Sequence, residues 1–156
     1  MGRRTSVRYV TNPATGQTGR TGVDRDASTD AITRAWNNAP PETFRVRWTG
    51  FLVVTQPGVY TFATSSDDGS AVAIDGERVV DNTGDHGLVT KTGRVQLGRG
   101  PHLVLVDYLQ AGGLYAMTWS WGARTLPCRR YPRGRCGHGA PASGERTPFA
   151  SSIRCS

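Results

Sequence analysis

The chain has little of what a disulfide-held or membrane-spanning protein needs. Its 156 residues include only three cysteines, Cys128, Cys136 and Cys155, and all of them lie near the C-terminus. The rest of the chain therefore has no disulfide framework. No run of about 18 apolar residues occurs, and the segment after Met1 lacks the apolar stretch of a signal peptide. We expect no membrane insertion and see no export signal.

Lysine is nearly absent, because 18 of the 19 basic residues are arginines and Lys91 is the exception. The net charge of +7 is also unevenly placed. Residues 44–122 carry six basic and seven acidic residues, whereas residues 123–156 carry seven arginines and one glutamate. A nucleic-acid-binding protein places its cations on the folded surface, interleaved with aromatic side chains. No nucleic-acid partner is expected for the nearly neutral central region.

What the chain does have is a series of short apolar segments separated by turn residues. It is 37% hydrophobic and contains 20 glycines and nine prolines. Apolar and polar residues alternate along several segments, as in half-buried strands. These segments are 44–49, 60–64, 71–74, 77–80, 94–97, 103–109 and 115–121. Their spacing predicts an all-β fold, an antiparallel sandwich or barrel of about seven or more short strands.

The same patterns divide the chain into three parts. Residues 1–30 lack an apolar period and are expected to form a flexible arm. Residues 31–122 form the β-sandwich module, which begins with one short helical turn over 31–38 that Pro40 and Pro41 end. Residues 123–156 are rich in Arg, Gly and Pro. This tail is either disordered or the out-of-frame end of a longer gene.

Two turns are expected to close hairpins within the module. Asp75-Gly76 is a dipeptide that tolerates positive φ, and it separates two short apolar segments. Gly98-Arg99-Gly100-Pro101 separates two longer ones, so a second hairpin is expected there.

The strongest local signal is the sequence Ser66-Asp67-Asp68-Gly69-Ser70, between two otherwise apolar strands. In a regular strand, Asp67 and Asp68 would point to opposite faces. They converge on one ion only if the backbone turns sharply or the peptide bond between them is cis. Calcium takes about six to eight oxygen ligands, and Gln110 with the carbonyl groups of loop 110–113 offers more of them. The alternative is a loop in which one aspartate caps a turn and the other is solvated.

Four motifs in order resemble the PA-fourteen family, named after the N-terminal region of anthrax protective antigen. They are Phe44-Arg45-Val46-Arg47-Trp48-Thr49-Gly50-Phe51-Leu52, Pro57-Gly58-Val59-Tyr60-Thr61-Phe62, Ser66-Asp67-Asp68-Gly69-Ser70 and Ile74-Asp75-Gly76. Tyr108-Leu109-Gln110-Ala111-Gly112-Gly113-Leu114-Tyr115 is similar to a further loop of the family. The resemblance covers about half of the chain. It does not extend to the family's opening strand, or to the strand expected after Trp121.

The resemblance implies a calcium-dependent carbohydrate-binding module of the lectin type, without catalytic activity. In the family's lectins, two consecutive aspartates joined by a cis peptide bond hold calcium, and they match Asp67 and Asp68. Gln110 is the expected third metal ligand, and Gly112 and His86 are added as candidate glycan contacts. The implied partner is a hexose-containing glycan, bound by a monomeric module in an extracytoplasmic or cell-surface location. The 44–121 stretch most resembles copies attached to bacterial membrane glycosyltransferases.

The other candidate residues have simpler interpretations. His86 fits an exposed loop imidazole, and Trp48, Trp119 and Trp121 alternate as core residues do, although tryptophan rings also stack on sugars. Cys128, Cys136, His138 and Cys155 have the residue types of a zinc site without its spacing. No nucleophile with a histidine and an acid, and no phosphate-binding loop, is recognisable.

Three hypotheses remain open from the sequence. The chain is a calcium-dependent sugar-binding module, a structural or protein-interaction module of the same fold, or the accessory domain of a truncated membrane glycosyltransferase. The first requires glycan binding that depends on the metal. The second allows a protein partner without calcium.

Overall fold

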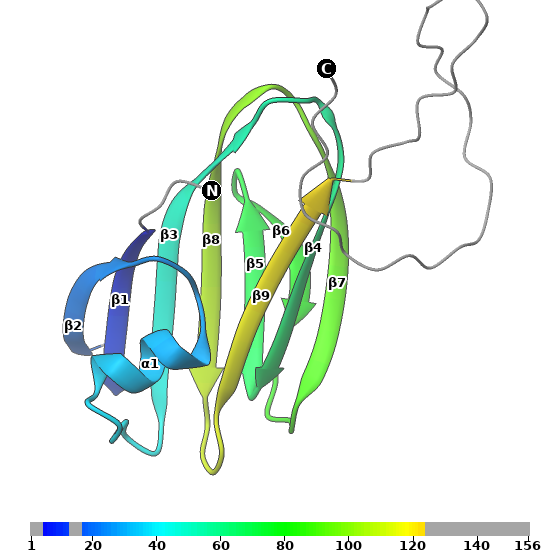
Figure 1. Ribbon diagram of the computed structural model, residues 1–156. Helices are drawn as coiled ribbons and strands as arrows, with labels where there is room; N and C mark the ends of the chain where they lie inside the picture. Colours follow the sequence, from blue (N-terminus) through cyan, green and yellow to red (C-terminus); the bar gives the residue numbers. More distant parts are fainter. Residues whose placement is uncertain (1–4, 13–16, 124–156) are drawn as a thin grey trace, which may run out of the picture. The chain divides into compact units, whose positions relative to one another are not determined.

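The computed structural model describes residues 5–12 and 17–123 of the protein (Figure 1). Nine strands and one short helix lie in these ranges. In chain order they are β1 (Thr5–Asn12), β2 (Gln17–Asp24), α1 (Thr29–Ala35), β3 (Phe44–Val54), β4 (Gly58–Asp67), β5 (Gly69–Ile74), β6 (Glu77–Asn82), β7 (Val89–Leu97), β8 (Gly100–Gln110) and β9 (Ala116–Ala123).

The strands form two antiparallel sheets. The larger sheet has the order β2-β1-β3-β8-β5-β6, and the smaller one has the order β7-β4-β9. Figure 1 shows β9 and β4 in front of β8 and β5, with α1 in front of β1 and β3. The all-β fold class predicted from the alternating pattern is therefore confirmed.

Strand β3 illustrates why the sequence folds this way. Its residues alternate strictly between buried and more exposed positions, so one face enters the core. It pairs with β8 along its whole length, from Phe44 opposite Gln110 to Val54 opposite Gly100. At one end, Phe44 lies 4.8 Å from Trp36 and 5.8 Å from Tyr108 between ring centroids. These contacts join α1 to the larger sheet.

The expectation of a flexible arm over residues 1–30 is wrong for the described residues 5–12 and 17–24. Strands β1 and β2 pair with each other, and β1 also pairs with β3, with Tyr9 opposite Val46. Tyr9 is only 2% exposed, and its ring packs edge-on against Trp36 at 4.9 Å. A strand that gains its stability from pairing and one buried ring has too weak a local pattern to be recognised in the sequence.

The short helical turn after this region is confirmed, although it begins two residues earlier than expected. Ser28 caps α1, because its hydroxyl accepts a hydrogen bond from the Ala31 amide at 3.3 Å. Ala31 and Ile32 face the core and are at most 2% exposed. The tail expected over 123–156 lies outside the described residues, except for Ala123 at the end of β9.

The two predicted hairpins have different outcomes. Asp75 and Gly76 have φ values of 52° and 89°, and they join the paired strands β5 and β6 as expected. The hairpin over 98–101 is wrong, because β7 belongs to the smaller sheet and β8 to the larger one. Gly98 to Pro101 therefore carries the chain from one sheet to the other.

The two sheets come very close where β7 passes β6. The register of β5 and β6 shifts between Val72 and Ala73, which leaves Val79 as an extra residue on β6. A Cβ atom placed on Gly93 of β7 would lie 1.7 Å from the carbonyl oxygen of Val79. Only glycine fits at this crossing.

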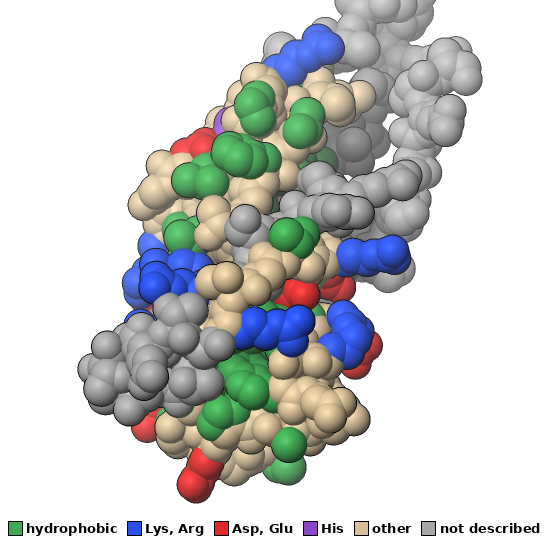
Figure 2. Space-filling view, turned by 90° about the vertical axis from the view of Figure 1, so that its left-hand side faces the viewer, with side chains coloured by type: hydrophobic (Ala, Val, Ile, Leu, Met, Phe, Trp, Pro, Cys, Tyr) green, Lys and Arg blue, Asp and Glu red, His purple; other side chains and the backbone are tan. Residues whose placement is uncertain are grey.

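The outer face of the larger sheet carries both charged and apolar side chains. Arg47 and Asp107 form a two-point ion pair with distances of 2.6 and 2.8 Å. Phe51, Val53 and Leu103 are exposed farther along β3 and β8. On the side seen in Figure 2, basic side chains have acidic ones beside them, and hydrophobic side chains gather toward the upper end. In the described part of the chain, no helix has the length and apolar character needed to cross a membrane.

An ion pair fixes the β5–β6 turn to β8, and we expect it to make stability depend on pH. His102 Nδ1 lies 2.6 Å from the Asp75 carboxylate, which also accepts the Leu103 amide at 2.8 Å. The hydrogen bond to Asp75 raises the pKa of His102 and lowers the pKa of Asp75.

The stabilisation from His102 is fully present below its unfolded pKa and is lost as the pH rises through the higher folded value. The contribution of Asp75 is lost instead when the pH falls through its lowered pKa. The pair is therefore most stabilising between about pH 4 and 6.5. The native chain should have a lower melting temperature at pH 8.5 than at pH 6. For His102→Gln, this decrease in melting temperature should be smaller. An equal difference in the two proteins would contradict this prediction.

Candidate functional site

The site is built where β4 ends and β5 begins. Asp67 is the last residue of β4, Gly69 is the first residue of β5, and Asp68 is the only residue between them. The peptide bond between Asp67 and Asp68 is cis, as the family resemblance implied. The turn faces loop 83–88, which follows β6, and loop 111–115, which follows β8.

Asp68 joins these two loops through main-chain hydrogen bonds. Its Oδ1 accepts the amide N–H of His86 at 3.0 Å, and its Oδ2 accepts that of Ala111 at 2.9 Å. The residue is only 7% exposed. Because the two loops come from distant parts of the chain, this one carboxylate fixes their positions relative to each other.

The two carboxylates of the site form no ion pair among the described residues, although the hydrogen bond to the Gly87 carbonyl and, to a smaller extent, the charge of Asp68 raise the pKa of nearby His86. No Lys, Arg or His side chain there forms an ion pair with Asp67 or Asp68. Burial, followed by the charges of Asp68 and Asp67, raises the pKa of the neighbouring Tyr108 hydroxyl. A buried carboxylate held only by neutral amides favours binding of a cation.

Asp67 differs from Asp68 in its surroundings. Its half-buried carboxylate has no hydrogen-bond partner in the described part of the chain, so it is available to a ligand. Its main-chain carbonyl is held in place, because it accepts a hydrogen bond from the Tyr108 hydroxyl. The peptide is therefore fixed while the carboxylate is free.

Gln110 acts as a support for the adjacent loop. Its Oε1 lies 2.5 Å from the Tyr108 hydroxyl, and its Nε2 donates to the carbonyls of Gly112 and Leu114 at 2.7 and 2.9 Å. The side chain is 1% exposed. All its polar atoms are thus used inside the protein. Of the two sources of further ligands considered from the sequence, the carbonyl groups of the loop fit better than the Gln110 side chain.

A buried polar cluster supports the turn on its other side. The hydroxyl groups of Ser66 and Ser70 lie 2.7 Å apart, and Asn82 Nδ2 donates to Ser66 at 3.0 Å. Asn82 Nδ2 also donates to the carbonyl of Val89 at 3.0 Å. Gly69 lets the following loop approach, because a Cβ atom there would lie 2.9 Å from the carbonyl oxygen of Gly84.

His86 lies beside the aspartates, but its ring is used within its own loop. Nδ1 lies 2.8 Å from the carbonyl oxygen of Gly87, and Nε2 lies 3.0 Å from that of Asn82. These two carbonyl groups raise the pKa of the imidazole. The contact of His86 with Asp68 is through its main-chain amide, which has no signature in the sequence.

The donor atoms of this site suit calcium. Two adjacent carboxylates and main-chain carbonyl groups are the hard oxygen ligands that calcium takes. Within the described ranges, no group of three His, Cys, Asp or Glu side chains could hold a metal. Cys128, Cys136, His138 and Cys155, which have the residue types of a zinc site without its spacing, lie outside those ranges.

The three tryptophans considered from the sequence separate into two kinds. Trp48 is a core residue, 1% exposed, and its Nε1 donates to Asp24 at 3.0 Å. Trp119 is half-buried and Trp121 is 36% exposed, and both line a pocket away from the aspartates. Asp75 supports its turn, as expected.

The chain belongs to the PA14 domain family, whose model matches residues 4–124. This match includes β1 and β2, which the motifs in the sequence did not reach. No curated protein matches the chain.

Several solved structures share the fold. An anti-sigma factor domain-containing protein from Clostridium clariflavum is 22% identical, with a TM-score of 0.67, over 78% of this chain and 42% of that one. The PA14 sugar-binding domain from an RTX adhesin is 19% identical, with a TM-score of 0.65, and the match covers 78% of this chain and 90% of that one. The epithelial adhesin 6 A domain from Candida glabrata, solved with Galβ1-3GlcNAc, is 12% identical, with a TM-score of 0.58. The match covers 79% of this chain and 80% of that one.

The matched length differs between these proteins. This chain spans about two fifths of the anti-sigma factor domain-containing proteins and most of the adhesin domains. Glycosidases also share the fold, but only 15 to 17% of their chains is covered. The likeness therefore concerns one module of such enzymes.

Proposed function

We propose that the chain is a non-catalytic module that binds hexose-containing glycans with calcium at Asp67 and Asp68. The observation that carries the proposal is the buried Asp68 carboxylate, which has two amide donors and forms no ion pair among the described residues. The names of two structural relatives, a sugar-binding domain of an adhesin and an adhesin with a bound disaccharide, support the glycan.

The chain's own residues have distinct parts in this proposal. Asp68 holds loops 83–88 and 111–115 in place, and Asp67 presents its carboxylate to the ligand. The carbonyl groups of the second loop that do not accept from Gln110 are the further oxygen donors, because the polar atoms of Gln110 are used inside the protein. Calcium, when bound, supplies coordination positions for neighbouring sugar hydroxyls. The two loops then determine which sugar fits.

Binding suits this pair better than hydrolysis. The two carboxyl groups of a glycosidase stand about 5 to 9 Å apart on either side of the scissile bond. Asp67 and Asp68 are consecutive residues at one turn, so a sugar approaches them from one side. We place the module outside the cytoplasm, where glycans of this kind occur. Attachment to a membrane glycosyltransferase stays a prediction.

The experiment is calcium titration by calorimetry, followed by a glycan array with and without EDTA. Asp67→Asn removes the free carboxylate, so we expect calcium affinity to fall at least about tenfold, or ~1.4 kcal/mol. Array signals should disappear in EDTA and in this variant. Asp107→Asn is the matched control, because Asp107 pairs with Arg47 on the outer face of the larger sheet and contacts neither loop. Two results would contradict calcium-dependent binding at this pair. One is a titration in which calcium gives no heat of binding, and the other is an array whose glycan signals all persist in EDTA.

A protein-interaction module is the second candidate. Phe51 and Val53 are 56% and 58% exposed on the outer face of the larger sheet, beside Leu103. Apolar side chains gathered on a surface are typical of protein contacts. Such a module would bind its partner in EDTA and tolerate Asp67→Asn.

A further inference from the structure

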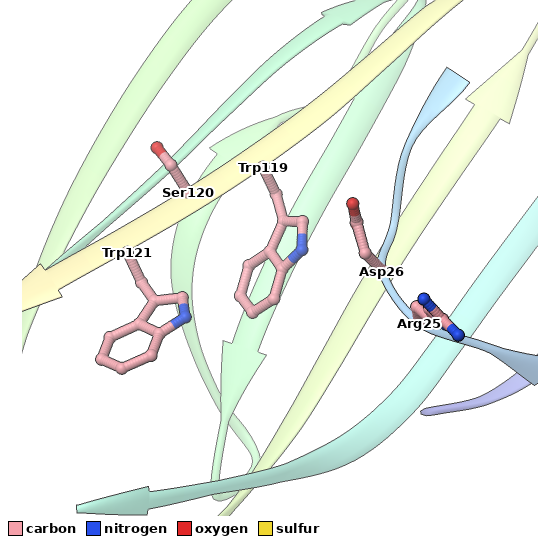
Figure 3. Close-up of a pocket in the computed structure, with 5 residues that line it drawn as sticks. All are labelled: Arg25, Asp26, Trp119, Ser120 and Trp121. Carbon is pink, nitrogen blue, oxygen red and sulfur yellow. The ribbon is translucent and has the colours of Figure 1, made fainter. Parts of the chain in front are cut away.

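A second site lies along β9, beside the segment that follows β2. The two are joined at one end, where Ser28 forms a β-bridge with Thr118. There the Thr29 hydroxyl also lies 2.8 Å from the amide and 3.1 Å from the carbonyl of Met117. Farther along β9 a pocket of about 330 Å³ opens, lined by Arg25, Asp26, Trp119, Ser120 and Trp121 (Figure 3).

The two indole rings form the apolar part of this pocket. Trp119 and Trp121 alternate on β9, so both side chains extend from the same face of the strand (Figure 3). The ring of Trp121 packs against that of Tyr60 at 6.1 Å, and Trp119 packs against the core. Each ring is thus held on one side and remains partly exposed to a ligand, whereas Trp48 is buried.

The polar part comes from Arg25 and Asp26. Both side chains are exposed, and neither has a hydrogen-bond or ion-pair partner in the described part of the chain. In Figure 3, Asp26 lies on the side of Trp119 that carries the indole nitrogen. The pocket therefore has a guanidinium group that can donate hydrogen bonds and a carboxylate that can accept them.

The balance of charge indicates the class of ligand. Arg25 disfavours a cation and Asp26 disfavours an anion, so the pocket suits a neutral molecule. The indole faces need an apolar surface, while the arginine and aspartate need hydroxyl groups. A pyranose ring with equatorial hydroxyls combines a flat C–H face with a polar edge. The pocket volume is at the lower end of the range for ligand sites, about 300 to 1,000 Å³.

We propose that this pocket is a second saccharide-binding site, which works without calcium. It is separate from the aspartate pair, because Asp67 lies opposite Ala116 at the start of β9 and Trp121 lies near its end. Five residues of strand correspond to roughly 17 Å. Asp26 is the only acid among the described residues that line the pocket, so we expect binding there to continue in EDTA.

The test uses the full chain in EDTA with cellotetraose, followed by calorimetry and by the indole N–H signals in NMR. We expect the signals of Trp119 and Trp121 to shift and that of the buried Trp48 to stay. Trp121→Ala and Asp26→Ala should each weaken binding at least tenfold, and Trp121→Tyr should retain part of it. Phe51→Ala is the control, because Phe51 is an exposed ring on the larger sheet. Sorbitol, which has the hydroxyls without the ring, should cause no shifts.

This result is distinguishable from failure of the calcium site. Asp67→Asn should leave cellotetraose binding in EDTA unchanged, even where calcium binding is lost. No heat and no indole shift at millimolar cellotetraose would overturn the second site. So would binding that survives both Trp121→Ala and Asp26→Ala. Asp26→Ala changes an exposed side chain, so it stays informative if Trp121→Ala fails to fold.

Discussion

Replacing Gly93 by alanine is expected to destabilise the module by about 3 kcal/mol or more, at the upper end for overpacked sites. The new Cβ atom would lie 1.7 Å from the Val79 carbonyl oxygen and 2.6 Å from its carbonyl carbon. Main-chain atoms cannot rotate away as a side chain does. The two sheets would have to separate where β6 and β7 cross, so we expect the melting temperature to fall by more than about 10 °C.

Gly58→Ala is the matched control for this measurement. Gly58 begins β4 in the same sheet, and a Cβ atom there meets nothing within 4 Å. Both substitutions remove similar freedom from the unfolded chain, so their difference reports the contact in the folded protein. Equal melting temperatures for the two variants would show that the crossing of the sheets is not tight.

The second large effect is expected for Asp68→Asn. The new amide group has one acceptor oxygen, whereas Asp68 accepts the amides of His86 and Ala111 with separate oxygens. One buried N–H would then face another donor, which costs about 1 to 3 kcal/mol. Loops 83–88 and 111–115 would lose their common attachment, and calcium-dependent glycan binding should be lost with it.

Asp67→Asn should behave differently, because the Asp67 carboxylate has no hydrogen-bond partner in the described part of the chain. It should lose calcium binding, but its free energy of unfolding should stay within about 0.5 kcal/mol of the native value, as for other substitutions that break no buried contact. Hydrogen exchange at the His86 and Ala111 amides separates the two roles. Faster exchange in Asp68→Asn alone is expected. The same exchange rates in both variants would mean that Asp68 does not hold the loops.

The sequence was sufficient to predict strands whose alternation is strong. Strand β3 has a buried residue at every second position, and the turn at Asp75-Gly76 has its own signature. Strands β1 and β2 have no comparable pattern, because they are held by pairing with each other and, through β1, with β3. The crossing from β7 to β8 was mistaken for a hairpin, because the same glycine-rich turn serves both connections.

The candidate site shows a similar division. The two aspartates and the later loop stood out because acidic and glycine residues interrupt apolar strands. The partners of Asp68 are main-chain amides, which every residue except proline possesses. The role of Gln110 depends on hydrogen bonds to Tyr108, Gly112 and Leu114, and such contacts exist only after folding. The residue types therefore indicated the place, but not which atoms do what.

The use of main-chain donors by Asp68 has a consequence for how new specificities could arise. The amides of His86 and Ala111 remain when their side chains are exchanged, so the contact with Asp68 does not depend on those side chains. Many loop residues can therefore be varied while the ends of the loops stay fixed. Libraries randomised at 83–88 and 111–114, but keeping the positive-φ glycines Gly84, Gly112 and Gly113 and excluding proline at 86 and 111, would change the recognition surface and preserve its anchor. The module is in this respect a scaffold for evolving receptors, in nature or in the laboratory.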